Sequence, residues 1–382
     1  MKSYDVAILG GGVAGLWTAN ALKARGYSVV LFSKTDLGAG QTLAAQGVIH
    51  GGAKYALAGK LTDSSEQLAA MPGRWRDALN GKGDIDLSGV EVLSPSQTLW
   101  SLPSVTSQVV SFFGSKLMRG RADALPRESW PEALQSDRYH GRVFKIDEPV
   151  IDPVSLVASL SASLSGICYQ ADCEIKGSGG RIESITADGI EIEAETYVFA
   201  AGAGNADLMK AAGVENPAMQ LRPLHQLVAR GDLPDFYSVC IGNGPKPPMV
   251  TTTHTDSSGR KIWWIGGDIA EANGVARSES EQIEAGRGLL QKFLPWIRWD
   301  EMEIFTARAN RAEPLTESGE RPPGAFCQKV GNILVTWPTK LALAPDLSDQ
   351  VIGHLGAPQS PGGNATPLDL PSPGIGKPPW DR

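Results

Sequence analysis

The sequence predicts an α/β protein that combines a parallel sheet with a second, mixed sheet. The first observation is an apolar run, a glycine turn, a helical stretch and a second apolar run within about 30 residues at the start of the chain. The second is another buried run, Tyr197–Ala201, which enters the glycine turn Gly202-Ala203-Gly204 and so returns the chain to that unit. The third is a Trp-rich and Arg-rich texture over residues 221–312, typical of a separate mixed sheet. The length of 382 residues suits two domains or one elaborate α/β unit.

The first part of the chain alternates strands with helices, as parallel sheets require. The predicted elements are a strand at Tyr4–Leu9, a helix at Val13–Arg25, a strand at Ser28–Phe32 and a helix from Asp63 to about Asn80-Gly81. The stretch Thr35–Gly52 between them shows no period and is predicted to be a loop, and loops of this length are usually functional. Pro72 is expected to bend or interrupt the second helix.

The rest of the chain mixes short strands with few helices. Residues 90–142 predict the first piece of the second sheet. The following elements are a helix at Val154–Ser163, strands at Ile167–Tyr169 and Cys173–Ile175, a hairpin of Ile182–Ile185 with Ile190–Glu193 around Asp188-Gly189, the strand Tyr197–Ala201, one helix at Glu279–Phe293, a strand at Gly331–Thr336 and a helix from about Leu347 to Leu355. After Gly356 the chain is rich in Pro, Gly and Ser, which predicts a tail draped over the surface or disordered.

Composition limits the partners and the location. There are 35 Lys and Arg against 42 Asp and Glu, a net charge of −7, without a basic run, which argues against nucleic acid as a partner. The four cysteines have neither a CxxC spacing nor a His cluster beside them, so we expect reduced thiols, no disulfide framework and no metal site. Apolar runs of roughly 18 residues are absent, and no cleavage site follows the apolar start, so we expect a cytoplasmic protein without a transmembrane segment.

Gly10, Gly12 and Gly15 fit the pattern G-x-G-x-x-G between a strand and a helix, which predicts a dinucleotide site. The first glycine permits a tight turn, the second a close approach of a pyrophosphate, and the third close packing of helix on strand. The acid that normally holds the adenosine ribose is replaced by Ser33, followed by Lys34. A serine hydroxyl can bond a ribose, whereas a lysine there could favour a 2′-phosphate, so NADP competes with other dinucleotides.

Four stretches together resemble the D-amino acid oxidase and glycerol-3-phosphate dehydrogenase superfamily of FAD enzymes, in that superfamily's order. They are DVAILGGGVAGLWTANALKARGYSVVLFSK, GAGQTLAAQGVIHGGAKY, TYVFAAGAG and WPTKLALAP, and the resemblance extends from Tyr4 to about Leu355. It is nearest to the glycerol-3-phosphate and 2-hydroxyglutarate dehydrogenases. The resemblance implies a Rossmann-like FAD-binding domain from residues 1–88, 149–217 and 324–356, a mixed-sheet substrate-binding domain from 89–148 and 218–323, and a tail from 357–382.

The resemblance also implies which residues contact non-covalently bound FAD. They are Gly10, Gly12, Gly15, Ala201 and Gly202 at the pyrophosphate, Ser33 and Lys34 at the ribose, Cys173 at the adenine half, Gln41, Thr42, Gln46 and Gly47 along the isoalloxazine, and Pro338, Thr339, Lys340 and Leu341 beneath its pyrimidine edge. The superfamily often has glycine where this chain has Trp337-Pro338. Since a reduced flavin carries negative charge near N1, an ammonium at Lys340 would stabilise it; a solvated lysine at a helix start is the alternative.

Candidate catalytic residues follow from the same stretches. His50 is expected to assist substrate binding or proton removal, with covalent attachment to the flavin as an alternative, and Lys54 and Tyr55 match a basic residue and tyrosine beside the flavin. Arg311 begins RAEPLTESGERP, which resembles the hairpin with which amino-acid oxidases hold a carboxylate; a surface ion pair with Glu313 is its alternative. His225 and His254 are further candidates in the substrate half, and Arg308 is expected at the edge of the Arg311 site.

These residues predict a FAD-dependent oxidoreductase, either a dehydrogenase or an oxidase. We expect it to oxidise a C–H bond next to a hydroxyl or amine of a small anionic substrate, such as a 2-hydroxy acid or a glycerol-3-phosphate-like compound, by hydride transfer to flavin N5. An external electron acceptor or oxygen would reoxidise the flavin. The alternatives are an amino-acid or amine oxidase of the same superfamily and a flavin-binding protein without turnover.

Overall fold

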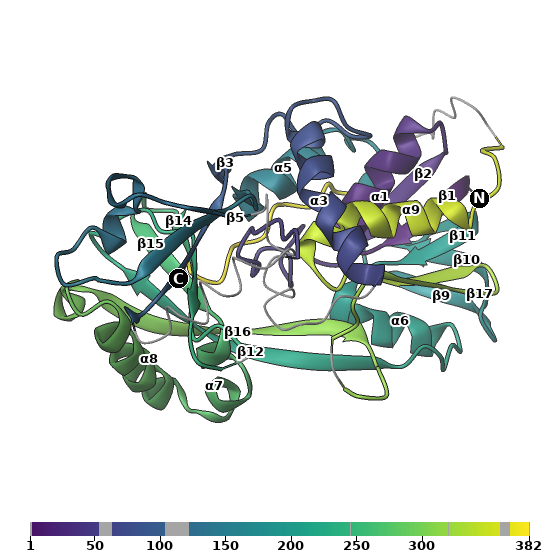
Figure 1. Cartoon of the computed structure of the whole chain (residues 1–382). Helices are drawn as coiled ribbons and strands as arrows, with labels where there is room; N and C mark the ends of the chain where they lie inside the picture. Colours follow the sequence, from purple (N-terminus) through teal and green to yellow (C-terminus); the bar gives the residue numbers. More distant parts are fainter. Residues whose placement is uncertain are drawn as a thin grey trace.

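The chain folds around two eight-stranded sheets that lie side by side in Figure 1. This computed structural model describes residues 2–52, 63–103, 122–244, 246–319, 321–359 and 367–381. One sheet carries the glycine turns, and the other carries the long strands β12 and β16, which extend back toward the first sheet along the lower side of Figure 1. The predicted α/β class with a second, mixed sheet is confirmed, and the first sheet is itself mixed, with parallel strands at its centre and antiparallel pairs at β17–β18, β10–β11 and β9–β10.

The first sheet has the order β17-β18-β11-β1-β2-β8, with β10 and β9 attached beside β11. Its strands are β1 (Lys2–Leu9), β2 (Val29–Ser33), β8 (Cys168–Gln170), β9 (Cys173–Ser178), β10 (Arg181–Ala187), β11 (Ile190–Phe199), β17 (Phe326–Val330) and β18 (Ile333–Trp337). β18, β11, β1, β2 and β8 are parallel neighbours. Their carboxyl ends therefore meet at one edge, where α/β sheets bind their ligands.

One strand of this sheet differs from the prediction. The predicted strands 190–193 and 197–201 are merged into the single strand β11, which ends at Phe199 and pairs with β10 at its start and with β1 along its length. The turn between β10 and β11 is the predicted one, with positive φ at Asp188 (46°) and Gly189 (83°). β17, which precedes the last strand, was not predicted.

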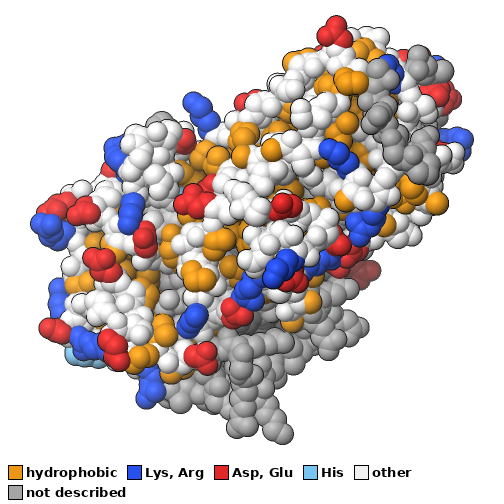
Figure 2. All heavy atoms as spheres, turned by 90° about the horizontal axis from the view of Figure 1, so that it is seen from above, with side chains coloured by type: hydrophobic (Ala, Val, Ile, Leu, Met, Phe, Trp, Pro, Cys, Tyr) orange, Lys and Arg blue, Asp and Glu red, His pale blue; other side chains and the backbone are white. Residues whose placement is uncertain are grey.

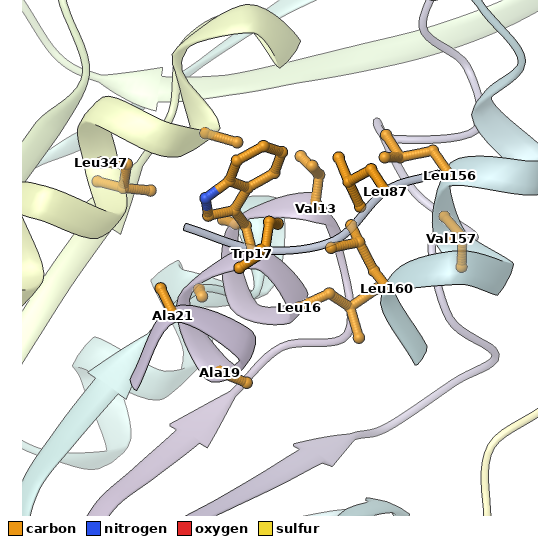
Figure 3. Close-up of a cluster of buried hydrophobic side chains, with 14 of the residues drawn as sticks. Val13, Leu16, Trp17, Ala19, Ala21, Leu87, Leu156, Val157, Leu160 and Leu347 are labelled. Carbon is orange, nitrogen blue, oxygen red and sulfur yellow. The ribbon is translucent and has the colours of Figure 1, made fainter. Parts of the chain in front are cut away.

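Helices cover both faces of the first sheet. Four pack on one face, α1 (Val13–Ala24), α3 (Asp63–Leu79), α5 (Pro153–Ala162) and α9 (Ala344–Gly353), and α6 (Asn205–Ala211) packs on the other. Alternate residues of β1 serve the two cores, with Ile8 toward α1 and Ala7 toward the opposite face. Figure 3 shows Trp17 of α1 with Leu347 of α9 on one side and Leu87 on the other. α3 continues through Pro72, so of the two predicted effects, a bend or an interruption, the interruption is wrong.

The second sheet has the order β16-β12-β15-β14-β13-β4-β6-β5. Its strands are β4 (Gln97–Ser101), β5 (Ala122–Ala124), β6 (Arg142–Ile146), β12 (Met219–Arg230), β13 (Ser238–Ile241), β14 (Val250–Thr255), β15 (Lys261–Gly266) and β16 (Glu303–Pro314); α7 (Ala272–Ala276) and α8 (Glu279–Phe293) lie beside it, and β3 (Val92–Ser94) and β7 (Val150–Ile151) form a separate pair. α8 has the predicted bounds because Ser278 and Glu281 form a capping box at its start. The short α7 was not predicted.

The C-terminal segment 367–381 is ordered and packed. It crosses from the first sheet to the second, as the yellow trace in Figure 1 shows. Leu37 donates its N–H to Gly374 O at 2.7 Å and accepts from Gly376 N at 2.9 Å. Trp380, 1% exposed, packs against Trp264 and other apolar residues of the second sheet. For these residues the prediction of disorder is wrong, because an apolar side chain fixes the end of a polar segment.

On the face drawn in Figure 2, acidic and basic side chains are interspersed rather than gathered into one basic patch. Among the described residues, no helix has the length and apolar character that crossing a bilayer requires.

Candidate active site

A cavity of about 1570 Å³ is lined by residues of both sheets. Ordinary small-molecule pockets have roughly 300–1,000 Å³, so this one has room for a dinucleotide together with a second, smaller molecule. Its lining includes the turns that follow β1, β2, β11 and β18, together with one face of β12 and β16. Of the predicted cofactor residues, these line it: Gly10, Gly12, Ser33, Lys34, Gln41, Thr42, Gln46, Gly47, Cys173, Ala201, Gly202, Pro338, Thr339, Lys340 and Leu341.

The amino end of α1 faces the cavity. Its N-cap, Gly12, has no side chain, so the positive end of the helix dipole is open to an anion, although the first N–H of the helix is used in a bond to Thr42. Gly15 lies outside the cavity lining and has a packing role: a Cβ on it would come within 2.0 Å of Gly10 O. Gly10 has φ +135°, and its Cβ would lie 2.3 Å from the carbonyl carbon of Ala200. The turn therefore has the three features that the glycine pattern predicts for a pyrophosphate site: a tight turn, an N-cap without a side chain and close packing of helix on strand.

The loop Thr35–Gly52 connects α1 to the second sheet through side-chain hydrogen bonds. Thr42 Oγ1 accepts from Val13 N at 3.0 Å. Gln41 Oε1 accepts from Ala312 N of β16 at 3.1 Å. Gln46 Nε2 donates to the carbonyls of Val250 and Trp264 at 3.0 and 3.1 Å. These polar side chains thus brace the loop across the gap between the sheets, with the loop backbone lining the cavity.

The predicted ribose residues are held by local partners. Ser33 Oγ donates to Thr35 O at 2.7 Å, and Lys34 forms an exposed ion pair with Asp172 at 2.7 Å. Cys173 begins β9 beside Asp172, and both line the cavity. The lysine thus has a carboxylate partner, which weakens the argument for a 2′-phosphate at this end.

The turn after β18 approaches the cavity in a constrained form. Thr339 has φ +58°, which is rare for a β-branched residue, and its hydroxyl donates to Gly324 O at 2.8 Å. Lys340 N donates to Pro338 O, which closes a three-residue turn. The Lys340 side chain is buried and Nζ donates to Pro323 O at 2.8 Å. The lysine is therefore fixed at the cavity wall rather than solvated.

His50 lines the cavity and is paired with a carboxylate that the sequence did not reveal. Glu148 Oε2 lies 3.2 Å from His50 Nδ1, while Glu148 Oε1 accepts from Gly51 N at 2.7 Å. The Glu148 side chain is only 4% exposed. A carboxylate at Nδ1 holds the ring in one orientation and favours the tautomer or ion with a proton on Nδ1. The pair is thus suited to take up or release a proton at Nε2.

Four basic side chains, Arg222, Lys246, Arg311 and Arg321, line one end of the cavity. Arg222 and Arg311 are directly opposite each other in the register of β12 and β16. Arg311 Nη2 lies 3.3 Å from Glu271 Oε1, and the buried Glu313 pairs with Arg222 and Arg321. Burial, reinforced by the charge of Arg321, lowers the pKa of Arg311 to about 10.

The cluster has two carboxylates, Glu271 and Glu313, against its four basic side chains. Burial favours protonation of Glu271, but Arg311, Lys246 and Arg222 outweigh it and hold the pKa of Glu271 below its ordinary value. Arg311 is thus a half-buried member of a basic cluster, and its predicted alternative, a surface pair with Glu313, is wrong. The cluster can bind an anion.

Several other candidates lie elsewhere. His225 bonds Gly274 O and Thr306 Oγ1, each at 2.9 Å, and does not line the cavity. His254 is fully buried under Trp380, and burial lowers its pKa to about 3. Arg308 donates to the carbonyls of Val275 and Arg277, away from the Arg311 cluster.

Lys54 and Tyr55 lie outside the described residues. The sequence reasoning missed Glu148, Arg222, Glu271 and Gln226. Of these four, Arg222 and Gln226 had a signal in the sequence: with Leu224 they are alternate residues of one strand, which share a face, and all three line the cavity.

Comparisons with known proteins agree with this geometry. Residues 5–315 match the model of the FAD dependent oxidoreductase family, DAO. The chain is 43% identical to the "Probable FAD-dependent oxidoreductase PA4991" of Pseudomonas aeruginosa, over 99% of this chain and 98% of that protein. The crystal structure of PA4991 superposes with a TM-score of 0.86 at 38% identity, covering 99% and 98% of the two chains.

More distant structures share the fold. Glycine oxidase from Geobacillus kaustophilus has a TM-score of 0.63 at 18% identity, covering 92% of this chain and 94% of that one. L-alpha-glycerophosphate oxidase from Mycoplasma pneumoniae has a TM-score of 0.63 at 15% identity, covering 96% and 100%. The chain therefore belongs to the DAO family of FAD-dependent oxidoreductases and is an enzyme whose cofactor is FAD.

Proposed function

We propose that this enzyme oxidises a C–H bond next to a hydroxyl or amino group of a small anionic substrate, either a 2-hydroxy acid or a glycerol-3-phosphate-like compound. The observation that carries the proposal is the basic cluster on the cavity wall, in which Arg222 and Arg311 stand opposite each other. A guanidinium binds carboxylate or phosphate through two parallel hydrogen bonds. Arg311 accordingly anchors the anion of the substrate.

The His50–Glu148 pair supplies the base for an alcohol substrate. Glu148 holds Nδ1, so that Nε2 of His50 can accept the hydroxyl proton and the positive charge that results is stabilised by the carboxylate. FAD, when bound, accepts the hydride from the substrate carbon at its N5 atom. Lys340, held at the wall by Pro323 O, places positive charge in the cavity where the resemblance expects the pyrimidine edge.

The anion anchor is tested by mixing the holoenzyme anaerobically with lactate, 2-hydroxyglutarate, glycerol 3-phosphate, and D- and N-methyl amino acids, and by recording which compound bleaches the flavin. With the reactive compound, Arg311→Ala should raise KM about tenfold or more, since one charge-assisted contact contributes roughly 1.5–3 kcal/mol. Arg308→Ala, on the same strand but outside the cavity, is the matched control and should leave KM unchanged. Equal KM values for the two variants would reject Arg311 as the anchor.

Amino acids and amines are the second candidate class of substrate. Glycine oxidase and the L-proline dehydrogenase of P. horikoshii share the fold and act, by their names, on amino acids. A neutral amine needs no protein base, so His50→Ala separates the classes: it should lower kcat at least a hundredfold for an alcohol and much less for an amine.

Two further parts of the proposal concern electron transfer and domain organisation. Reoxidation would use an external acceptor or oxygen, because only one dinucleotide fingerprint is present in the sequence; the rate of return of flavin colour on admitting air distinguishes them. Residues 1–88, 149–217 and 324–356 would form the FAD-binding domain, and residues 89–148 and 218–323 would form the substrate-binding domain.

A further inference from the structure

We propose that Gln46, Gln226 and Gly266 form a polar niche that binds the hydroxyl or uncharged amino group of the substrate at which oxidation occurs. All three residues line the cavity. The proposal rests on the proposed function and adds to it a second recognition site, distinct from the basic cluster. It concerns groups that can donate and accept a hydrogen bond at the same time.

The orientation of the Gln46 amide is fixed by the second sheet. Nε2 donates to the carbonyls of Val250 and Trp264, so both amide hydrogens are used. Oε1 is the remaining polar atom, and it lies 3.4 Å from the position that a Cβ on Gly266 would take. The niche therefore presents an acceptor whose direction is set by the protein.

The Gln226 amide faces the same position from β12, and no described residue hydrogen-bonds it. Its Nε2 lies 3.4 Å from the same Cβ position on Gly266. The side chain is 3% exposed, and within the described part of the chain its Oε1 is buried without a hydrogen bond. A glutamine that served only packing would leave a polar group desolvated for no gain. A bound group that accepts a hydrogen bond from Nε2, beside Gly266, gives this amide a polar contact, while the buried Oε1 does not meet the ligand.

Gly266 keeps the niche open. It lies at the end of β15, and its φ is outside the positive range, so an alanine is compatible with the backbone. A methyl group there would make ordinary contacts with both amides and would fill the space between them. The niche can thus be closed without removing either amide.

The niche and the basic cluster share one face of β12. Arg222, Leu224 and Gln226 all line the cavity, and the two polar residues are four positions apart on the strand. At roughly 3.3 Å per residue the Cα atoms of Arg222 and Gln226 are about 13 Å apart, and the long arginine side chain spans part of that distance. The substrate is thus held by its anion at one end and by its reacting heteroatom at the other.

Hydrogen-bond polarity makes the niche selective. A hydroxyl can donate to Gln46 Oε1 and accept from Gln226 Nε2, and a neutral amine can do the same. An ammonium group has donors only, which leaves Gln226 Nε2 facing other N–H groups. Alcohols and deprotonated amines are therefore the favoured forms.

The test uses two matched pairs of ligands that differ by hydroxyl groups, lactate with propionate and glycerol 3-phosphate with propyl phosphate. Each is titrated anaerobically into the photoreduced holoenzyme, whose flavin cannot accept a hydride, and binding is followed by isothermal titration calorimetry. In the wild type, the hydroxylated member of at least one pair should bind about tenfold tighter. Gly266→Ala and Gln226→Leu should each abolish that preference and leave the affinity of the unsubstituted anion unchanged. Gly288→Ala, in α8 where an added Cβ meets nothing within 4 Å, should keep the preference.

Three results would overturn the niche: no preference in the wild type for either pair, a preference that survives Gly266→Ala, or a changed flavin spectrum or potential in ligand-free Gln226→Leu. The last result would assign the amide to the flavin. These outcomes are separable from failure of the proposed function, which is measured by flavin bleaching. An enzyme bleached by a hydroxy acid whose binding preference survives both variants retains the function and loses the niche.

Discussion

Replacement of Trp380 by alanine tests whether the C-terminal segment is part of the fold. The indole is 1% exposed, stacks on His254 at 4.5 Å between ring centroids and contacts Trp264 at 5.4 Å. Its backbone carbonyl accepts from Arg230 Nη2 at 2.7 Å, a bond that the substitution keeps. Loss of a buried tryptophan side chain costs about 3–5 kcal/mol.

The expected shift in melting temperature follows from the chain length. The entropy of unfolding is about 2.1 cal/mol/K per residue, which for a chain of 382 residues amounts to roughly 0.8 kcal/mol/K. A loss of about 3–5 kcal/mol therefore lowers Tm by about 4–6 °C. Thermal unfolding followed by circular dichroism measures it. Leu315→Ala removes an apolar side chain that is 56% exposed and should shift Tm by less than about 1 °C.

Trp380→Ala should also weaken the binding of FAD. The segment that Trp380 fixes is hydrogen-bonded on both sides to Leu37, whose neighbours Asp36 and Gly38 line the cavity. Flavin fluorescence after dilution should therefore rise faster in Trp380→Ala than in the wild type. A Tm shift no larger than that of Leu315→Ala would refute the structural role of the segment.

Variants at three other positions test particular contacts. Burial lowers the pKa of His254 to about 3, so below about pH 6.5 the unfolded chain binds a proton that the folded chain does not. The free energy of unfolding therefore falls by up to ~1.4 kcal/mol for each pH unit of acidification. His254→Phe should flatten that slope, measured by melting curves at pH 5 to 8. Parallel slopes for the two proteins would contradict it. Thr339→Gly relieves a positive φ and should remain close to the wild type in urea titrations, whereas Thr339→Val keeps the strain, loses the bond to Gly324 and should cost about 1–2 kcal/mol; a less stable glycine variant would contradict this reasoning. Glu148→Gln removes the carboxylate at His50, so the pH profile of kcat for an alcohol substrate should move toward lower pH, and an unmoved profile would exclude Glu148 as a positioning residue.

Elements with local signals were predictable from the sequence. The glycine turn between β1 and α1, the Asp188-Gly189 turn and the capping box of α8 each depend on residues a few positions apart, and all three are present. β11 was divided in two because Glu193-Ala194-Glu195 interrupts its apolar pattern; pairing with β1 carries the strand through that interruption. Local composition also hid the role of Trp380, because the apolar surface that buries it comes from distant strands.

The candidate site was predictable in its residue types but not in its partners. Motif resemblance placed His50 and Arg311 at the cavity, and both line it. Glu148, which bonds His50, is 98 residues away in the sequence, and Glu271, which pairs with Arg311, is 40 residues away. A sequence supplies no register between such positions. The chemistry of His50 and Arg311 depends on these contacts, so it could be derived only from the folded structure.

Strand register decides which side chains of β12 face the cavity. Alternate residues point to opposite faces, so Arg222, Leu224 and Gln226 line the cavity while His225 bonds Thr306 and the carbonyl of Gly274 on the other face. A slip of one residue would exchange these sets, bringing His225 to the cavity and burying Gln226 behind the sheet. The twelve-residue pairing of β12 with β16 makes such a slip costly. The sheet therefore does more than support the site, because its register selects an amide and an arginine, rather than a histidine, as the groups that line the cavity.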